Sequence, residues 1–473
     1  MTRFANTALL TGLAALLLSA CGEPPPPDAG PDRVTIAEPG PIPVTEQQPG
    51  DPDAGRHTVL NRGYVTCGIP DAAFRASDIF PAPEHQIDGR EGRNAELPYM
   101  FNSTVNPDGV ELVVSNCLTC HASEFDGELV IGLGNPFLDF TSDPSVTAEL
   151  MGAFVEDGAP AEAWARWADR IAAIAPYMVT DTFGVNPAPN LTLALIAHRD
   201  AATLAWSSEP LLEPPPADPL PTKVPPWWRM QHKAAMFHNG MGRGDHVRYM
   251  MMKSLVCTDD TEEASEIAEW FTDVRAYIAS LEPPSYPYPV DPELAAQGEG
   301  VFNRVCASCH GSYGAERDYP NLLVDLDAVG TDPAYARQAV ESERFARWFN
   351  RSFYGDGAEA MPALGYVAPP LDGVWATAPY LHNGSVPTIE ALLDSTLRPT
   401  YWQLRTDPRE YDPDRLGWRF DVLESGKGEA DDPAAAKRIY DTTRHGYGNE
   451  GHRFGDGLRE QERQALMEYL KTL

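Results

Sequence analysis

The chain has 473 residues, of which 43% are hydrophobic and 22% charged, the ordinary composition of a soluble globular protein with two or three domains. Its 69 acidic residues outnumber its 36 basic residues, so that the formal net charge is -33. A surface of this sign repels phosphate backbones and anionic lipid headgroups, which argues against nucleic-acid binding and favours a basic or neutral partner.

The first 21 residues have the pattern of an export signal. A basic start precedes an apolar run that is too short to span a bilayer and that ends in Leu18-Ser19-Ala20-Cys21. These four residues resemble the bacterial lipobox, whose cysteine becomes the lipidated first residue of the mature chain. Gly22 then favours sorting to the outer membrane. We expect a protein of the periplasm or cell surface that meets the membrane only through a lipid at Cys21. A plain secretory signal is the alternative.

Residues 22–56 follow this signal and are rich in proline and acidic side chains. Such a composition buries too little apolar surface to form a core. The sequence therefore predicts a disordered, semi-extended tether.

The pattern C-x-x-C-H occurs twice, at residues 117–121 and 306–310. This spacing is typical of c-type haem attachment, because two thiols add to the two vinyl groups of one porphyrin and the adjacent histidine lies under the iron. Zinc would need further Cys or His residues at matching spacing, and redox dithiols do not come in pairs that are each followed by His. We therefore predict two covalently bound haem c groups, attached through Cys117, Cys120, Cys306 and Cys309, with His121 and His310 as proximal iron ligands.

Two further cysteines, Cys67 and Cys257, are not followed by histidine. In an oxidising compartment we expect them to form a disulfide between the N-terminal segment and the region between the motifs. Two separate buried thiols are the alternative, since sequence does not determine the pairing.

Upstream of the motifs a small and a bulky residue recur at the same offsets: Gly109 with Val113, and Gly298 with Phe302. On a helix these positions share one face, so each motif is predicted to end a helix. In cytochromes c that face crosses the C-terminal helix, here 459–473 with Leu466 along one side.

The remaining periodicity is helical, and no β-rich block is visible. Helices are predicted over the four stretches 160–178, 191–206, 261–281 with Thr261 as its cap, and 332–352, with a proline-rich crossing segment at 209–226. We therefore expect a mostly α fold of two tandem cytochrome c-like domains with long loops. The boundary falls between Leu281 and Asp291, which gives an N-terminal domain at 57–285 and a C-terminal domain at 286–473.

The segment ATAPYLHNGSVPTIEAL, at 376–392, resembles the part of bacterial di-haem cytochrome c peroxidases that follows the second haem motif. With GYVAPPLDGVW before it and YGNEGHRFGDGL near the end, the chain is most similar to the branch of rubber oxygenases and di-haem fatty-acid dioxygenases. This resemblance implies a C-terminal haem that stores or relays an electron and an N-terminal haem that keeps a position open for peroxide or dioxygen. It also allows a calcium ion between the domains.

The resemblance implies His452 as the second ligand of the C-terminal iron, with Met361 in EAMPAL as the alternative. The methionine ligand of the classical peroxidases is absent, because Thr396 stands at that position. His382 is expected beside a haem edge and not on the iron.

Around the N-terminal haem, Trp227 and Trp228 resemble the aromatic residue that bridges the two haems, although two ordinary core tryptophans would look the same. Phe237 or His238 is expected at the open iron position. Arg243 and Asp245 are expected either to hold haem propionates or polarise peroxide, or to form a surface ion pair. Three functions remain open: a peroxidase-like enzyme acting on a small oxidant with a redox partner protein, a dioxygenase of an apolar unsaturated substrate, and a di-haem electron carrier.

Overall fold

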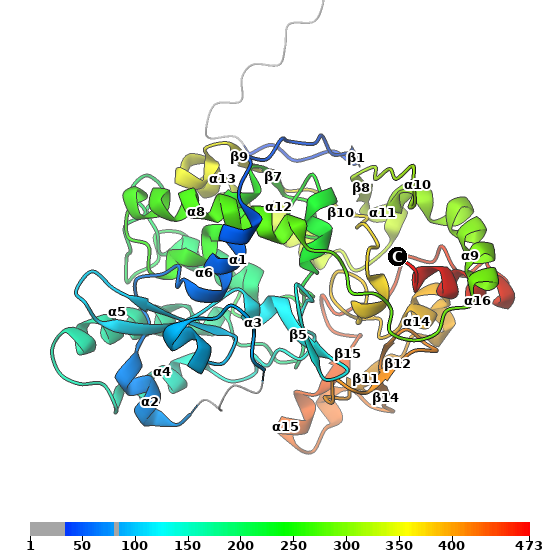
Figure 1. Ribbon diagram of the computed structural model, residues 1–473. Coiled ribbons are helices and arrows are strands. Elements are labelled where there is room, and N and C mark those ends of the chain that lie inside the picture. The colour runs from blue at the N-terminus through cyan, green and yellow to red at the C-terminus, as the bar shows by residue number, and fades with distance from the viewer. Residues whose placement is uncertain (1–33, 80–84) are drawn as a thin grey trace, which may run out of the picture.

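The computed structural model describes residues 34–79 and 85–473 (Figure 1). The predicted signal segment and the lipidation predicted at Cys21 lie outside the described residues. The helices are α1 Pro52–Asn61, α2 Asp71–Ser77, α3 Leu118–His121, α4 Pro144–Gly152, α5 Ala159–Ile174, α6 Ala188–Ala197, α7 His246–Met250, α8 Thr261–Ser280, α9 Pro292–Val305, α10 Ala307–His310, α11 Leu326–Val329, α12 Ala334–Glu341, α13 Glu343–Arg351, α14 Ile389–Leu393, α15 Pro433–Ala436 and α16 Glu460–Leu470. Short 3-10 helices include Trp227–His232 and Met251–Val256.

The strands are β1 Gly40–Pro41, β2 Ile69–Pro70, β3 Phe101–Val105, β4 Glu111–Ser115, β5 Ala122–Phe125, β6 Glu128–Ile131, β7 Gly242–Gly244, β8 Leu322–Asp325, β9 Ala358–Ala360, β10 Gly365–Val367, β11 Tyr401–Leu404, β12 Tyr411–Asp412, β13 Gly417–Trp418, β14 Phe420–Val422 and β15 Ile439–Asp441. They form small antiparallel sheets with the strand orders β2-β4-β3, β1-β8-β10 and β14-β11-β15, together with three two-stranded ribbons.

The prediction of a mostly α fold is wrong. The chain is about 40% helical and 14% strand, a mixed α/β structure. Many of the strands have only two to four residues and pair with partners far away in the chain, as β1 does with β8 and β7 with β9. Runs this short have no period of their own, so their extended form depends on the partner strand.

One type of helix crossing occurs twice in the fold. Helix α9 crosses α16 at Gly298, where an added Cβ would lie closer than 3.0 Å to the carbonyl of Ala465 and 2.8 Å from the Cβ of Tyr469. Helix α1 crosses α8 at Gly55 in the same way, against Asp273 and with 2.8 Å to the Cβ of Tyr277. Only glycine allows the two backbones to approach so closely. The predicted packing of the second motif's helix on the C-terminal helix is therefore present.

The corresponding prediction for Gly109 and Val113 is wrong. Gly109 lies in the turn between β3 and β4 with φ of +80°, and Val113 lies within β4, paired with Ser103. The β-branched run ELVVS favours a strand here, and the helix that crosses at a glycine is α1, which is separated from the first motif by residues 62–116. A small and a bulky residue at the same distances before each motif therefore lie in a helix before the second motif and in a turn and a strand before the first.

The prediction of a disordered tether is wrong for residues 34–56. This segment runs along the top of the molecule in Figure 1, where β1 pairs with β8 and Ala37 forms a bridge with Ala363. Val34, Ala37 and Ile42 are buried, and α1 begins at Pro52 with Asp51 as its cap. A few apolar side chains at spaced positions are enough to hold a proline-rich segment against a folded surface, and composition averaged over the segment hides them.

Two large hydrophobic cores exist, and each takes residues from both halves of the sequence. The first core contains Phe345, Trp348 and Phe349 of α13, which lies near α8 in Figure 1. The second contains Phe125 and Trp228, from the first half of the chain. Two tandem domains with separate cores are therefore not what the fold shows. The predicted boundary region 281–291 is the connection between α8, which Asp260 caps in place of Thr261, and α9.

A disulfide joins Cys67 to Cys257 inside the first core. The bond connects the segment before β2 to the end of the 3-10 helix Met251–Val256. It thereby holds the early strands against the region that surrounds the first C-x-x-C-H motif.

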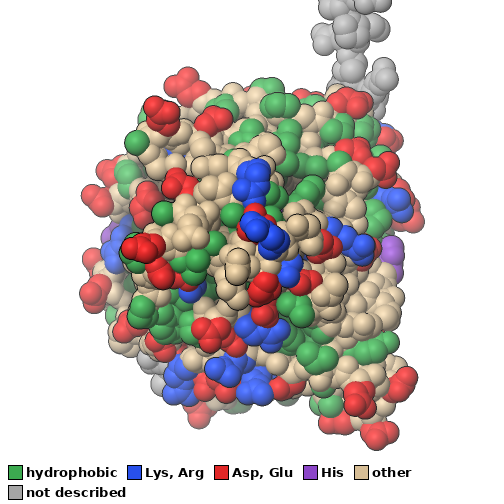
Figure 2. Space-filling view, turned by 90° about the vertical axis from the view of Figure 1, so that its right-hand side faces the viewer, with side chains coloured by type: hydrophobic (Ala, Val, Ile, Leu, Met, Phe, Trp, Pro, Cys, Tyr) green, Lys and Arg blue, Asp and Glu red, His purple; other side chains and the backbone are tan. Residues whose placement is uncertain are grey.

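The surface carries both signs of charge. Figure 2 shows acidic side chains around much of one face and basic side chains near its middle and lower part. Many of the basic residues on the helices nearest this side are already paired with carboxylates, for example Arg304 with Glu462 at 2.8 Å and Arg463 with Asp394 at 3.2 Å. Within the described residues, no helix combines the length and apolar character needed to cross a membrane.

Candidate functional site

Both C-x-x-C-H motifs line one continuous, mostly apolar cavity of about 630 Å³. The short helices α3 and α10 each present two cysteines and a histidine to it. All four cysteines are half-buried, and none of them forms a disulfide. Burial raises the pKa of Cys117 to about 11, and that of Cys306 also to about 11.

The second motif is paired with a distant histidine. The ring centroids of His310 and His452 are 6.1 Å apart, with 60° between the ring planes. A metal bonded to two imidazole nitrogens at about 2 Å each separates the ring centroids by about 6 Å. The other nitrogen of His310, Nδ1, donates a hydrogen bond to the carbonyl of Pro369 at 2.8 Å, which leaves Nε2 for a ligand. His310 and His452 therefore have the separation that two axial ligands of one iron require.

The first motif has a different neighbour. The His121 ring stacks on Trp227, with centroids 5.0 Å apart and 22° between the planes. Among the described residues no second histidine ring is paired with His121. The carbonyl of Pro225 lies beside the ring, although Nδ1 of His121 is buried without a hydrogen bond of ordinary geometry.

All three imidazoles are neutral at physiological pH. Burial, with Lys253 nearby, lowers the pKa of His121 to about 3, and burial beside His310 lowers that of His452 to about 4. The pKa of His310 is also lowered by burial. Neutral imidazole is the form that binds a metal, so these side chains fit an iron ligand set without any proton release.

Basic side chains line the cavity, and none of the described residues that line it is Asp or Glu. They are Lys223, Arg229, Lys233 and Lys253. Burial lowers the pKa of Lys233 to about 8 and that of Lys223 well below its usual range. An anionic occupant would favour the charged form of these side chains, and haem with its two propionates is one.

Two further residues that were predicted near the first motif, Phe237 and His238, do line the cavity. Phe237 lines the cavity with φ of +69° and packs edge-on against Tyr249, which stacks on Phe349 at 4.6 Å. His238 lines the cavity as well, but its Nε2 donates to the carbonyl of Lys223 at 3.0 Å, and this bond directs that nitrogen to the backbone.

Three other predicted residues do not line the cavity. Arg243 lies in β7 opposite Glu359 of β9, and Asp245 caps α7 by accepting a hydrogen bond from the Val247 amide. Met361 packs in a small apolar cluster with Ala37 and other residues and is not part of the lining of the cavity that contains His310. Arg243 and Asp245 therefore contact other parts of the fold and not the cavity. The ring that lies opposite His310 is that of His452.

The two adjacent tryptophans differ in position. Trp227 belongs to the first core and lines the cavity, whereas Trp228 is fully buried in the second core and does not line it. Trp228 Nε1 donates to the carbonyl of Asp372 at 2.8 Å. His382, predicted beside a haem edge, lines the cavity with Nε2 unpaired and stacks on Tyr366 at 4.0 Å.

A repeat that the sequence analysis missed organises these residues. Two Pro-Pro pairs, at 225–226 and 369–370, each precede a His-Asn-Gly by the same interval, 225 to 238 and 369 to 382. The residues just before the histidines, Phe237 and Leu381, both have positive φ, of +69° and +65°. A search for repeats of spaced motifs, instead of continuous similarity, would have found this pair in the sequence.

Comparison with known proteins places two family matches in the second half of the chain. Residues 293–381 match the family described as cytochrome C oxidase, cbb3-type, subunit III, and residues 365–403 match the family described as RoxA-like, cytochrome c-like. Residues 293–403 are therefore similar to cytochrome c-like domains. Such a domain implies covalently bound haem c and a role in electron transfer or redox chemistry, and the motif at 306–310 lies within the first match.

Two proteins of Sinorhizobium fredii are also similar. The uncharacterized protein y4iJ is 32% identical over 264 residues, which cover 41% of this chain and 42% of that protein. The uncharacterized protein y4iM is 29% identical over 331 residues, which cover 60% of this chain and 71% of that protein. The chain thus spans less than half the length of y4iJ. Neither printed name indicates an activity.

The calcium ion that the resemblance allowed has no assigned site. Among the described residues, no group of three or more His, Cys, Asp or Glu side chains is arranged to hold a metal ion.

Proposed function

We propose that the protein is a di-haem c-type cytochrome oxidoreductase of the periplasm or cell surface. In this proposal the haem at residues 117–121 activates hydrogen peroxide or dioxygen, and the haem at 306–310 relays electrons. The observation that supports it is the difference between the two motifs. His310 faces a second imidazole at 6.1 Å, whereas the ring against His121 is Trp227.

The residues that would hold the cofactors are the four motif cysteines and the histidines 121, 310 and 452. Haem supplies ligand activation where an axial position is open and one-electron storage where both positions are filled. Phe237 and Tyr249 pack edge-on in the lining of the cavity, where their apolar rings would limit the access of water. Trp227, stacked on His121 and next to Trp228, is suited to pass electrons between the sites.

A second candidate is oxygenation of an apolar unsaturated substrate at the same open position. The mostly apolar lining of the cavity favours it, because such a surface binds hydrocarbon chains without leaving polar groups unpaired. A small oxidant and a redox partner protein suffice for the first candidate, whereas the second requires an organic substrate that fits this lining.

Electron paramagnetic resonance of the ferric protein tests the proposal. One high-spin and one low-spin haem are expected, and carbon monoxide should shift the absorption spectrum of the reduced high-spin haem only. Two low-spin haems that bind neither carbon monoxide nor peroxide would instead indicate a di-haem electron carrier.

A further inference from the structure

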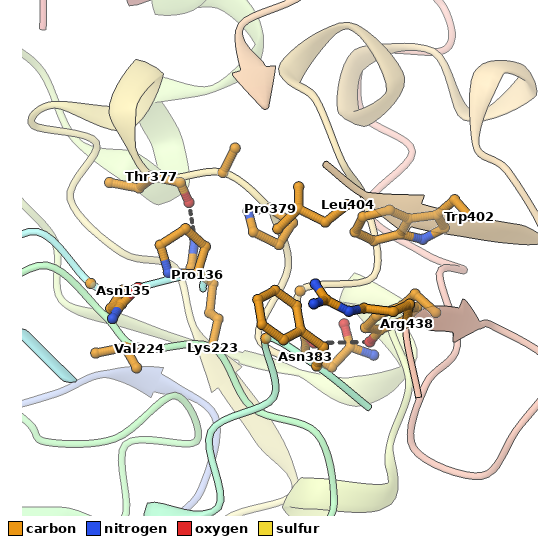
Figure 3. A pocket seen from close by; sticks show the side chains of 16 residues that line it. Asn135, Pro136, Lys223, Val224, Thr377, Pro379, Asn383, Trp402, Leu404 and Arg438 are labelled. Atoms are coloured by element: carbon orange, nitrogen blue, oxygen red, sulfur yellow. Dashed lines mark hydrogen bonds between the residues drawn. The ribbon is translucent and has the colours of Figure 1, made fainter. Parts of the chain in front are cut away.

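A small pocket lies beside the cavity, between residues of both halves of the chain (Figure 3). Arg438 and Trp402 line one side of it, and Lys223 and Thr377 line the other. Arg438 is half-buried, and its guanidinium stacks on Phe183 at 4.4 Å. The pocket therefore reaches from partly exposed residues into the interior.

The pocket adjoins the cavity at three residues that line both: Lys223, Val224 and Thr377. Nζ of Lys223 donates to the carbonyl of Thr377 and lies over the Tyr380 ring at 5.3 Å from its centroid. This nitrogen thus lies at the boundary between the small pocket and the site of the two motifs.

A basic side chain stands at each end of the pocket. Among the described residues, no Asp or Glu lines the pocket, and no carboxylate forms an ion pair with Arg438 or Lys223. The guanidinium of Arg438, without a carboxylate partner, attracts a negative ligand at one end, and Nζ of Lys223 offers a hydrogen-bond donor at the other. In a chain with a net charge of -33, this local positive field selects where a small anion approaches.

The size of the pocket limits that anion. Its volume is about 30 Å³. A single water needs about 10–15 Å³ on this scale, so the pocket holds the equivalent of about two or three waters. Ligands of two or three heavy atoms fit, whereas a fatty acid or a nucleotide does not.

We propose that this pocket is the route by which a small anion of two or three heavy atoms that is ionised at neutral pH, such as azide, reaches the cavity. Arg438 receives the anion and Lys223 passes it to the motif site. The route has a functional meaning only through the open iron position proposed above, and in this respect it rests on the proposed function. The binding of an anion in the pocket does not depend on that iron position.

The first test uses azide as the probe and measures its rate of binding to the ferric holoprotein by stopped-flow absorption. Arg438→Met should slow azide binding about 3- to 10-fold, the effect of removing one steering charge. Lys437→Met removes the same charge from the neighbouring residue, which does not line the pocket, and should change the rate little. Carbon monoxide binding to the ferrous protein should be equal in all three proteins, because that ligand is neutral.

The second test does not need an open iron. Crystals of the holoprotein are soaked in bromide, and anomalous density is expected between Arg438 and Lys223 and is expected to be lost in Lys223→Met. Equal azide rates in the Arg438 and Lys437 variants would overturn the route, and absence of bromide from the pocket would overturn the anion site. A wild-type protein that binds neither azide nor carbon monoxide would contradict the proposed function, and the bromide result would then decide the pocket alone.

Discussion

The amide of Lys223 donates a hydrogen bond to the carbonyl of His382 at 2.9 Å. At the matching position in the other copy of the Pro-Pro/His-Asn-Gly repeat, the amide of Val367 donates to the carbonyl of His238 at 2.8 Å. Lys223 and Val367 each stand two residues before a Pro-Pro pair, so each copy of the repeat holds the histidine loop of the other copy. The carbonyl of Pro369 also accepts the hydrogen bond of His310, so the second copy of the repeat is connected to the second motif.

His452→Gly should convert one low-spin haem to high spin, because the imidazole opposite His310 is then missing. Paramagnetic resonance and the midpoint potential measure the change, and the potential of that haem should rise. Met361→Ala is the matched control and should leave both spectra unchanged, since Met361 is not part of the lining of the cavity that contains His310. The reverse pattern would transfer the ligand assignment to Met361.

Substitution of the two tryptophans should have different effects. Trp228→Ala removes a fully buried side chain and its hydrogen bond to Asp372, so it should lower the free energy of unfolding by about 3–5 kcal/mol. Trp227→Phe keeps an aromatic ring on His121 and should slow inter-haem electron transfer with a smaller change in Tm. Normal transfer rates in both variants, in folded protein, would remove the tryptophans from the electron path.

Gly298→Ala should destabilise the crossing of α9 and α16, because its Cβ would lie closer than 3.0 Å to the carbonyl of Ala465. The helices must separate, and we expect a loss of about 1–3 kcal/mol in chemical unfolding. Gly300→Ala on the same helix is the control: no atom lies within 4 Å of its added Cβ. Since alanine is the better helix former, this variant should gain about 0.5–1 kcal/mol. Equal effects at both positions would contradict the close crossing.

His246 should make the protein less stable in acid. Burial, with the charges of Lys233 and Arg275, lowers the pKa of this histidine from 6.5 to about 4. Between these two values the unfolded chain binds a proton that the folded chain does not, so the free energy of unfolding falls as the pH falls from 6.5 to 4. The loss from this group is at most about 3 kcal/mol. Urea unfolding at pH 7.5 and 4.5 should show a smaller pH dependence in His246→Asn. Parallel pH dependences of the two proteins would refute the assignment.

The sequence by itself determined the chemistry of the motifs, because the spacing of two thiols and an adjacent histidine is a local property of five residues. It also determined α8, α9 and α16, whose apolar positions repeat at helical spacing over ten or more residues. Tertiary structure alone decided that α1 and α8 cross at Gly55, that residues 34–56 pack on the body, and that α13 joins the first core. It also brought Arg438 and Lys223 to opposite sides of one pocket. The physical reason is that two-residue strands, shared cores and unpaired buried charges depend on partners hundreds of positions away, and a local pattern contains no information about those partners.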